Sequence, residues 1–105
     1  MALQLLDLHL ADENERQCVY ETDDIQIMRI RLEAGDSLPT HQANANVLLV
    51  PLHGAVTIAA DGASVVARTG DAVSVPYQTS MDVSNQTNRP LTFLVLKTPH
   101  PKTFK

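Results

Sequence analysis

Four histidines and one cysteine are the side chains of this sequence best suited to metal binding or catalysis. His41 lies in the middle of the chain, whereas His9 and His100 lie near its ends, where we expect them to be exposed. His53 comes twelve residues after His41, and we expect it at the far end of a strand. A catalytic metal centre needs about three protein ligands, usually imidazoles and carboxylates. These histidines form no such set, so His41 is the residue around which we look for chemistry.

A period-two pattern predicts the β-strands that would position His41. Alternation of apolar and polar residues is clearest in residues 6–10, 25–32 and 73–75. The alternation slips near Met28. Residues 47–50 and 93–96 are continuous apolar runs, and 93–96 is typical of a strand that is buried on both faces. No stretch combines helical periodicity with caps, so we expect an all-β protein.

Turn signals recur about every ten residues along this pattern. They are Ala34-Gly35-Asp36, His53-Gly54, Asp61-Gly62, Gly70-Asp71 and Asn85 to Asn88. Asp61-Gly62 between two β-forming segments predicts a tight hairpin, because glycine adopts the positive φ that such a turn needs. Many short, evenly spaced strands favour a sandwich or a barrel. The tail from Thr98 to Lys105 contains two prolines, so we expect it to leave the sheet.

Length and composition limit the class of protein. The 105 residues suffice for one domain, and the 44% hydrophobic content provides a core. The net charge of -4 and the absence of a basic cluster argue against a nucleic-acid partner. Cys18 is the single cysteine, so we exclude an internal disulfide and expect a buried, inert thiol. Residues 1–10 are a poor signal peptide and too short for a membrane span, so we expect a cytoplasmic protein without a membrane partner.

Two stretches of the sequence resemble the paired motifs of the cupin superfamily. Gly35, His41 and Gly54 match the first motif, G-x5-H-x-H-x3-E-x6-G. Gly70, Pro76 and Asn85 match the second motif, G-x5-P-x-G-x2-H-x3-N. The spacer of residues 55–69 contains the Asp61-Gly62 hairpin, as in small cupins. The chain therefore resembles a small single-domain RmlC-like cupin, which implies a double-stranded β-helix, or jelly-roll barrel, with its core at about residues 16–98.

The same resemblance shows a degenerate metal-binding motif. In the family, three histidines and one glutamate bind Fe, Mn, Ni or Zn inside the barrel. Here the four positions hold His41, Ala43, Val47 and Met81, and Gln78 replaces a usual glycine. Alanine and valine offer no ligand atom, and a thioether suits Cu(I) rather than oxygen-activating iron. We therefore expect no cofactor; the alternative is a transition metal held by His41 and Met81.

The replaced positions predict an apolar ligand pocket inside the barrel. The residues that we expect to form it are His41, Ala43, Val47, Met81, Tyr77, Gln78 and Phe93. One interpretation is a metal-poor module that binds a small, partly apolar molecule; another is a filled core with a structural role. The third interpretation is an oxygenase or isomerase in which His41 carries an unusual metal or acts as a general base, with Tyr77 nearby.

The N-terminus predicts self-association. Leu3, Leu5, Leu6, Leu8 and Leu10 give residues 3–10 more apolar surface than one strand of a small monomer readily buries. Unpaired strand edges tend to be covered or paired, and the family resemblance also implies homodimers. We expect a twofold dimer with an N-terminal strand at residues 3–10 in or near the interface.

Overall fold

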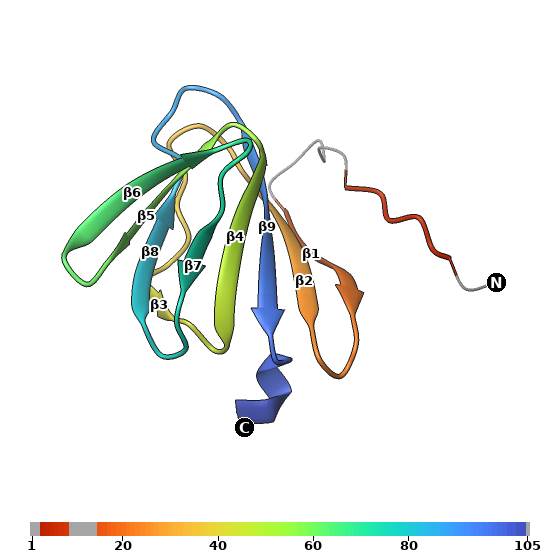
Figure 1. Cartoon of the computed structure of the whole chain (residues 1–105). Helices are drawn as coiled ribbons and strands as arrows, with labels where there is room; N and C mark the ends of the chain where they lie inside the picture. Colours follow the sequence, from red (N-terminus) through yellow and green to blue (C-terminus); the bar gives the residue numbers. More distant parts are fainter. Residues whose placement is uncertain (1–2, 9–14, 105) are drawn as a thin grey trace.

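Two antiparallel sheets face each other in the computed structural model, which describes residues 3–8 and 15–104 (Figure 1). The larger sheet has the order β1 (Glu15–Glu21), β2 (Gln26–Leu32), β9 (Leu91–Thr98), β4 (Asn46–His53) and β7 (Val73–Val75). The smaller sheet has the order β3 (His41–Gln42), β8 (Ser80–Ser84), β5 (Ala55–Ala60) and β6 (Ala63–Arg68). The all-β prediction is confirmed.

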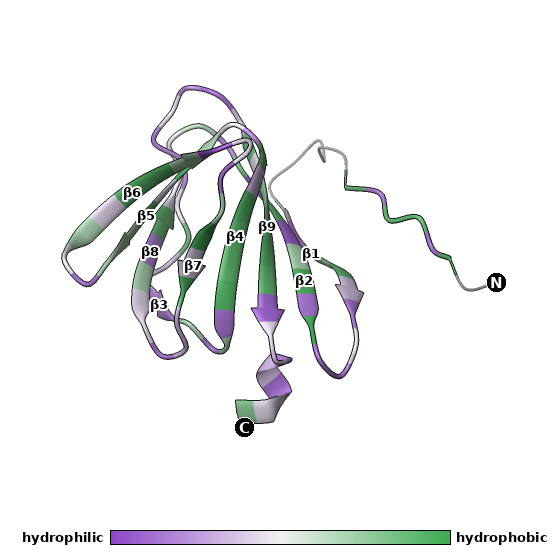
Figure 2. Cartoon of the chain, viewed as in Figure 1, coloured by the Kyte–Doolittle hydropathy of each residue, from purple (hydrophilic) through white to green (hydrophobic). Residues whose placement is uncertain are grey.

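The core lies between the two sheets because successive side chains of a strand point to opposite faces. Val47 and Leu49 of β4 and Phe93 and Val95 of β9 are buried there. The smaller sheet contributes buried residues that include Val56, Ile58, Met81 and Val83. Figure 2 shows this as predominantly hydrophobic colouring along β4 and β9. Within the continuous apolar runs 47–50 and 93–96, only every second side chain therefore reaches this core.

Turns at the predicted positions close the strands. Asp61 and Gly62 both have positive φ, 53° and 77°, as a two-residue turn of the hairpin between β5 and β6 requires. Gly54 has φ 88°, and a Cβ atom there would lie 2.9 Å from the carbonyl oxygen of Pro90. Glycine is therefore needed at position 54 for both conformation and space.

Asn85 fastens the loops next to β8 and β9. It is 1% exposed, and its Nδ2 donates to the carbonyl oxygens of Leu32 at 3.1 Å and Arg89 at 2.7 Å. Its Oδ1 accepts from the backbone N–H and hydroxyl of Thr87. A buried amide with this many partners holds several backbone groups that would otherwise be unsatisfied. The framework residue that the sequence motif singled out thus has a structural task.

One expectation about β1 was wrong. Met28, Ile30 and Leu32 share one face of β2, and the register shift next to Met28 lies in the partner strand β1, between Cys18 and Tyr20. Cys18 is exposed, and its Sγ lies 3.6 Å from the carbonyl oxygen of Tyr20. Cysteine is among the most often buried residue types, so composition alone favoured the opposite placement.

The outer face of the larger sheet carries apolar side chains. Leu94 and Leu96 of β9 are half-buried there, so β9 is fully buried on its inner face only, contrary to the expectation for residues 93–96. Residues 3–8 have no assigned strand, and Leu5 is 98% exposed; residues 9 and 10 lie outside the described residues. Within a single chain, residues 3–8 therefore do not form the strand that we expected at residues 3–10.

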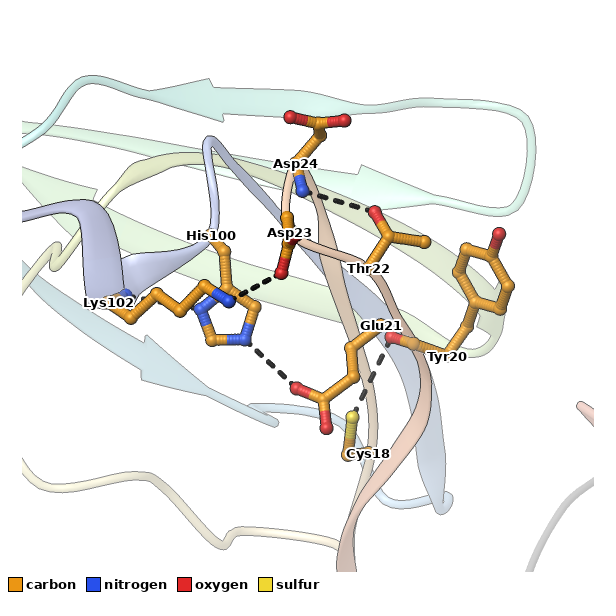
Figure 3. A network of polar contacts seen from close by, with 8 residues as sticks. All are labelled: Cys18, Tyr20, Glu21, Thr22, Asp23, Asp24, His100 and Lys102. Carbon is orange, nitrogen blue, oxygen red and sulfur yellow. Dashed lines mark hydrogen bonds and ion pairs between the residues drawn. The ribbon is translucent and has the colours of Figure 1, made fainter.

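The C-terminal segment leaves the sheet, as predicted, and docks on the turn between β1 and β2 (Figure 3). The segment ends in a 3-10 turn, η1 (Pro101–Phe104). Nε2 of His100 lies 2.9 Å from a carboxylate oxygen of Glu21, and Nζ of Lys102 lies 2.6 Å from Asp23. His100 is largely buried in this contact, contrary to the exposure expected near a terminus. At four residues, the helical segment of the described chain is far too short to cross a membrane.

Candidate functional site

A small cavity lies inside the barrel between the two sheets. Its volume is about 50 Å³, and its walls are mostly apolar. The larger sheet supplies Met28, Ile30, Val47, Leu49, Phe93 and Val95 to these walls. Ala43, Met81 and Val83 close the side formed by the smaller sheet and its flanking loop. The polar lining residues are Arg16, His41, Asn44 and Lys97.

Strand register explains why these side chains meet. Directly paired residues of antiparallel strands point to the same face of the sheet. Val47 pairs with Lys97, and His41 pairs with Met81. Ile30 pairs with Arg16 on one side and with Phe93 on the other. The register therefore places two cationic side chains and one imidazole among apolar neighbours.

His41 has one ring nitrogen engaged by the backbone. Its Nδ1 lies 2.9 Å from the carbonyl oxygen of Pro39. A carbonyl oxygen only accepts, so Nδ1 must carry the proton of this hydrogen bond. In neutral His41 the second nitrogen, Nε2, is then an unprotonated acceptor. His41 can thus accept a hydrogen bond or a proton in the cavity, as a general base or as a partner for a donor.

Arg16 and Lys97 make the cavity electropositive. Burial lowers the pKa of the Lys97 ammonium, and the charge of Arg16 lowers it further. Among the described residues, no carboxylate lines the cavity. Asp82, which follows Met81, is exposed and accepts a hydrogen bond from Thr40 outside the barrel. The exposed Arg16 and the half-buried Lys97 therefore give the lining of this largely apolar cavity a positive charge.

The structure brings together five of the seven predicted pocket residues. His41, Ala43, Val47, Met81 and Phe93 line the cavity. Their role in binding stays a prediction.

Tyr77 and Gln78 do not line the cavity, which corrects the prediction for both. The ring of Tyr77 stacks on Phe104 with centroids 4.0 Å apart. Its N–H donates to Asn46, so neither Tyr77 nor Asn46 holds the ring of His41. Gln78 adopts a positive φ of 70° in the loop before β8, and its N–H donates to the carbonyl oxygen of Ala43. The spacing of a motif fixed where these residues come in the chain, but the local turn set their direction.

The sequence-based prediction missed Arg16 and Lys97. Lys97 follows Phe93 and Val95 at intervals of two residues, so strand alternation already places it on the inner face of β9. Arg16 carries no comparable local signal, because its position depends on how β1 pairs with β2.

Comparisons with known proteins agree with this architecture. An uncharacterized protein of Methanocaldococcus jannaschii is 34% identical over 82 residues, which are 77% of this chain and 71% of that protein. Its crystal structure is described as an RmlC-like cupin with a double-stranded β-helix fold and superposes with a TM-score of 0.87, at 28% identity, over 98% of this chain and 96% of that one. The chain belongs to the RmlC-like cupin family. No family model matches the sequence.

More distant cupins share the fold alone. A cupin superfamily protein of Desulfitobacterium hafniense has a TM-score of 0.74 at 15% identity, covering 88% of this chain and 83% of its own. A cupin domain of Bordetella pertussis has a TM-score of 0.69 at 14% identity, covering 83% and 94%. These likenesses support the barrel and carry no information about ligands.

The cavity of this cupin does not fit the metal that the family usually binds. Of the four ligand positions, His41 offers an imidazole, Met81 a thioether, and Ala43 and Val47 nothing. Among the described residues, no three His, Cys, Asp or Glu side chains are grouped as a metal site would require. Arg16 and Lys97 line the same cavity and would repel a divalent cation. We therefore derive no chemistry through a metal.

Proposed function

We propose that this cupin binds a small carboxylate with a short apolar body in the barrel cavity. The observation that carries the proposal is the pair of cations, Arg16 and Lys97, at a cavity whose other walls are apolar apart from His41 and Asn44. An apolar chamber with a few polar groups is typical of a small-molecule site. A guanidinium also matches a carboxylate in shape and can donate two parallel hydrogen bonds to it.

The size of the cavity limits the apolar body of the guest. An engineered cavity of about 150 Å³ holds one benzene molecule, so on that scale about 50 Å³ holds roughly two carbon atoms. The carboxylate would lie toward Arg16 and Lys97, where charge is compensated, and the carbon chain would contact residues such as Val47 and Phe93. Propionate is the simplest molecule of this description.

The general-base alternative has less support. A His41 base that works with Tyr77 would need both side chains at the cavity, and Tyr77 is stacked on Phe104 instead. Among the described residues, no carboxylate lines the cavity to orient His41 or to share its proton. A filled core with a purely structural role is the remaining alternative, and the test below separates it from binding.

Binding is tested with three probes of similar size and different charge. NMR titration of the full chain with propionate, 1-propanol and propylamine should give perturbations in this order, with propylamine weakest because Arg16 and Lys97 repel it. Five heavy atoms limit affinity, so we expect a Kd for propionate of about 1 mM. Equal responses to the three probes, or shifts confined to the outer surface, would favour the structural role.

Two variants test the anion site itself. A hydrogen bond to a charged group contributes about 1.5–3 kcal/mol, so Arg16→Gln and Lys97→Gln should each weaken propionate binding by about tenfold or more. Arg68→Gln removes an exposed guanidinium at the end of β6, away from the cavity, and should leave binding unchanged. Equal losses in all three variants would indicate nonspecific attraction rather than a site.

A further inference from the structure

Lys97 differs from an ordinary surface lysine in two respects: its side chain lines an apolar cavity, and its two partners on the neighbouring strands carry no carboxylate. Its side chain leaves β9 on the face that carries Phe93 and Val95 and lines the apolar cavity. On the sheet it pairs with Val47 on one side and with Gln26 on the other, so its strand neighbours provide no carboxylate. Within the described part of the chain, the charged and titratable groups that share its cavity are Arg16 and His41.

This environment makes the charged form of Lys97 less favourable than it is for a lysine in water. Transfer of an ammonium group into an apolar cavity is costly, and a neighbouring guanidinium adds repulsion. Both effects lower the pKa of Lys97. A neutral primary amine in a hydrophobic cavity next to another cation is a nucleophile toward carbonyl carbon. Lys102, by contrast, is paired with Asp23 on the surface, and that carboxylate raises its pKa.

We propose that Lys97 reversibly captures a small 2-oxo acid as an imine, with the carboxylate of the guest held by Arg16. The proposal rests on the carboxylate binding inferred above and adds a covalent step at the adjacent carbon. The short apolar end of the guest, a methyl or ethyl group, occupies the space of about 50 Å³.

The step balances without an oxidant or another co-reactant. The Nζ lone pair of Lys97 forms a bond to the carbonyl carbon, and the C=O π electrons move to oxygen, which takes up a proton to give a carbinolamine. The hydroxyl group then leaves as water after a second proton is added, and the nitrogen lone pair forms the C=N bond. The nitrogen of Lys97 loses one proton to the surroundings when the carbinolamine forms, and it keeps the other in the iminium that departure of water leaves; loss of this second proton gives the neutral imine. When the ring of His41 is neutral with its proton on Nδ1, its Nε2 is a proton acceptor on a side chain that lines the same cavity.

Imine formation can be assigned to single lysines, because the chain contains three of them, Lys97, Lys102 and Lys105. The full chain is incubated with pyruvate and sodium borohydride, which reduces an imine to a stable secondary amine. Intact mass and peptide mapping then locate the adduct. A positioned amine reacts faster than a free one, so we expect at least about tenfold more adduct on Lys97 than on Lys102.

Matched variants give the remaining outcomes. Lys97→Arg keeps the charge but not the amine, so it should lose the adduct. Lys102→Arg should keep the adduct, and Arg16→Gln should reduce it at least about tenfold, in proportion to lost carboxylate binding. Propionate binding without an adduct, or equal labelling of Lys97 and Lys102, overturns the imine and leaves the proposed function standing. Absence of both propionate binding and adduct overturns both.

Discussion

Larger side chains at position 43 test whether the cavity is open. The structure predicts the sign of the resulting change in the free energy of unfolding. Ala43 is 2% exposed and lines the cavity of about 50 Å³. On the scale of roughly 25 Å³ per carbon atom, taken from a benzene-sized cavity, this space accepts the two additional carbons of Ala43→Val. Each buried methylene contributes about 0.8 kcal/mol, which sets an upper limit of about 1.6 kcal/mol. Imperfect fit reduces this value, so we expect a gain of about 1 kcal/mol in the free energy of unfolding.

Ala43→Leu adds one carbon more than the cavity holds. We expect it to lose about 1 kcal/mol, because overpacking a core costs about 1–3 kcal/mol and the cavity relieves part of this. Ala45→Val is the matched control, since Ala45 is fully buried but does not line the cavity and should show the full overpacking loss. For a chain of this size, 1 kcal/mol corresponds to a change in Tm of about 4–8 °C.

Thermal and urea unfolding of the three variants measure these differences, and NMR titration shows whether propionate still binds. Ala43→Val should abolish binding while it raises Tm. If Ala43→Val is as destabilising as Ala45→Val, the cavity has no usable space and the structural role is favoured. If Ala43→Val binds propionate as the unmodified chain does, the site lies elsewhere.

Three further outcomes follow from other parts of the fold. Oγ1 of Thr92 is buried without a hydrogen-bond partner among the described residues, so Thr92→Val should stabilise by about 1 kcal/mol in urea unfolding, whereas Thr92→Ser, which keeps the hydroxyl, should not. The hydrogen bond from His100 lowers the pKa of the Glu21 carboxyl below its usual 4.5. The stability that this hydrogen bond contributes is therefore present above pH 4.5 and lost as the pH falls. Glu21→Gln should consequently flatten the decline of Tm in this acid range. We also propose that a second copy of the chain covers the exposed leucines of residues 3–8 and the apolar outer face of the larger sheet. Sedimentation should then give a dimer, and Leu5→Glu should weaken it. A monomer of 11.5 kDa at micromolar concentration would contradict the proposal.

Much of the framework could be predicted from the sequence because its signals are local. Asp61-Gly62 specifies its turn through the φ angles that the two residues tolerate. Alternation along residues 91–98 specifies which side chains point inward, so the inward position of Lys97 could have been predicted from the sequence. The loss of the usual metal-ligand set is likewise a matter of residue type at positions 43, 47 and 81.

The content of the cavity required the tertiary structure. Arg16 reaches the cavity only because β1 pairs with β2 in a particular register, and a pairing partner is not encoded by the period of either strand. Tyr77 lies outside the cavity, where its ring stacks on Phe104. Phe104 is distant from Tyr77 in the sequence and reaches it only because the C-terminal segment docks on the barrel. The volume of about 50 Å³ is a small difference between the space enclosed by two sheets and the side chains that fill it. Sequence alone thus determined a barrel without its usual metal ligands, whereas long-range packing decided that a small cavity remains in the barrel and that Arg16 and Lys97 line it.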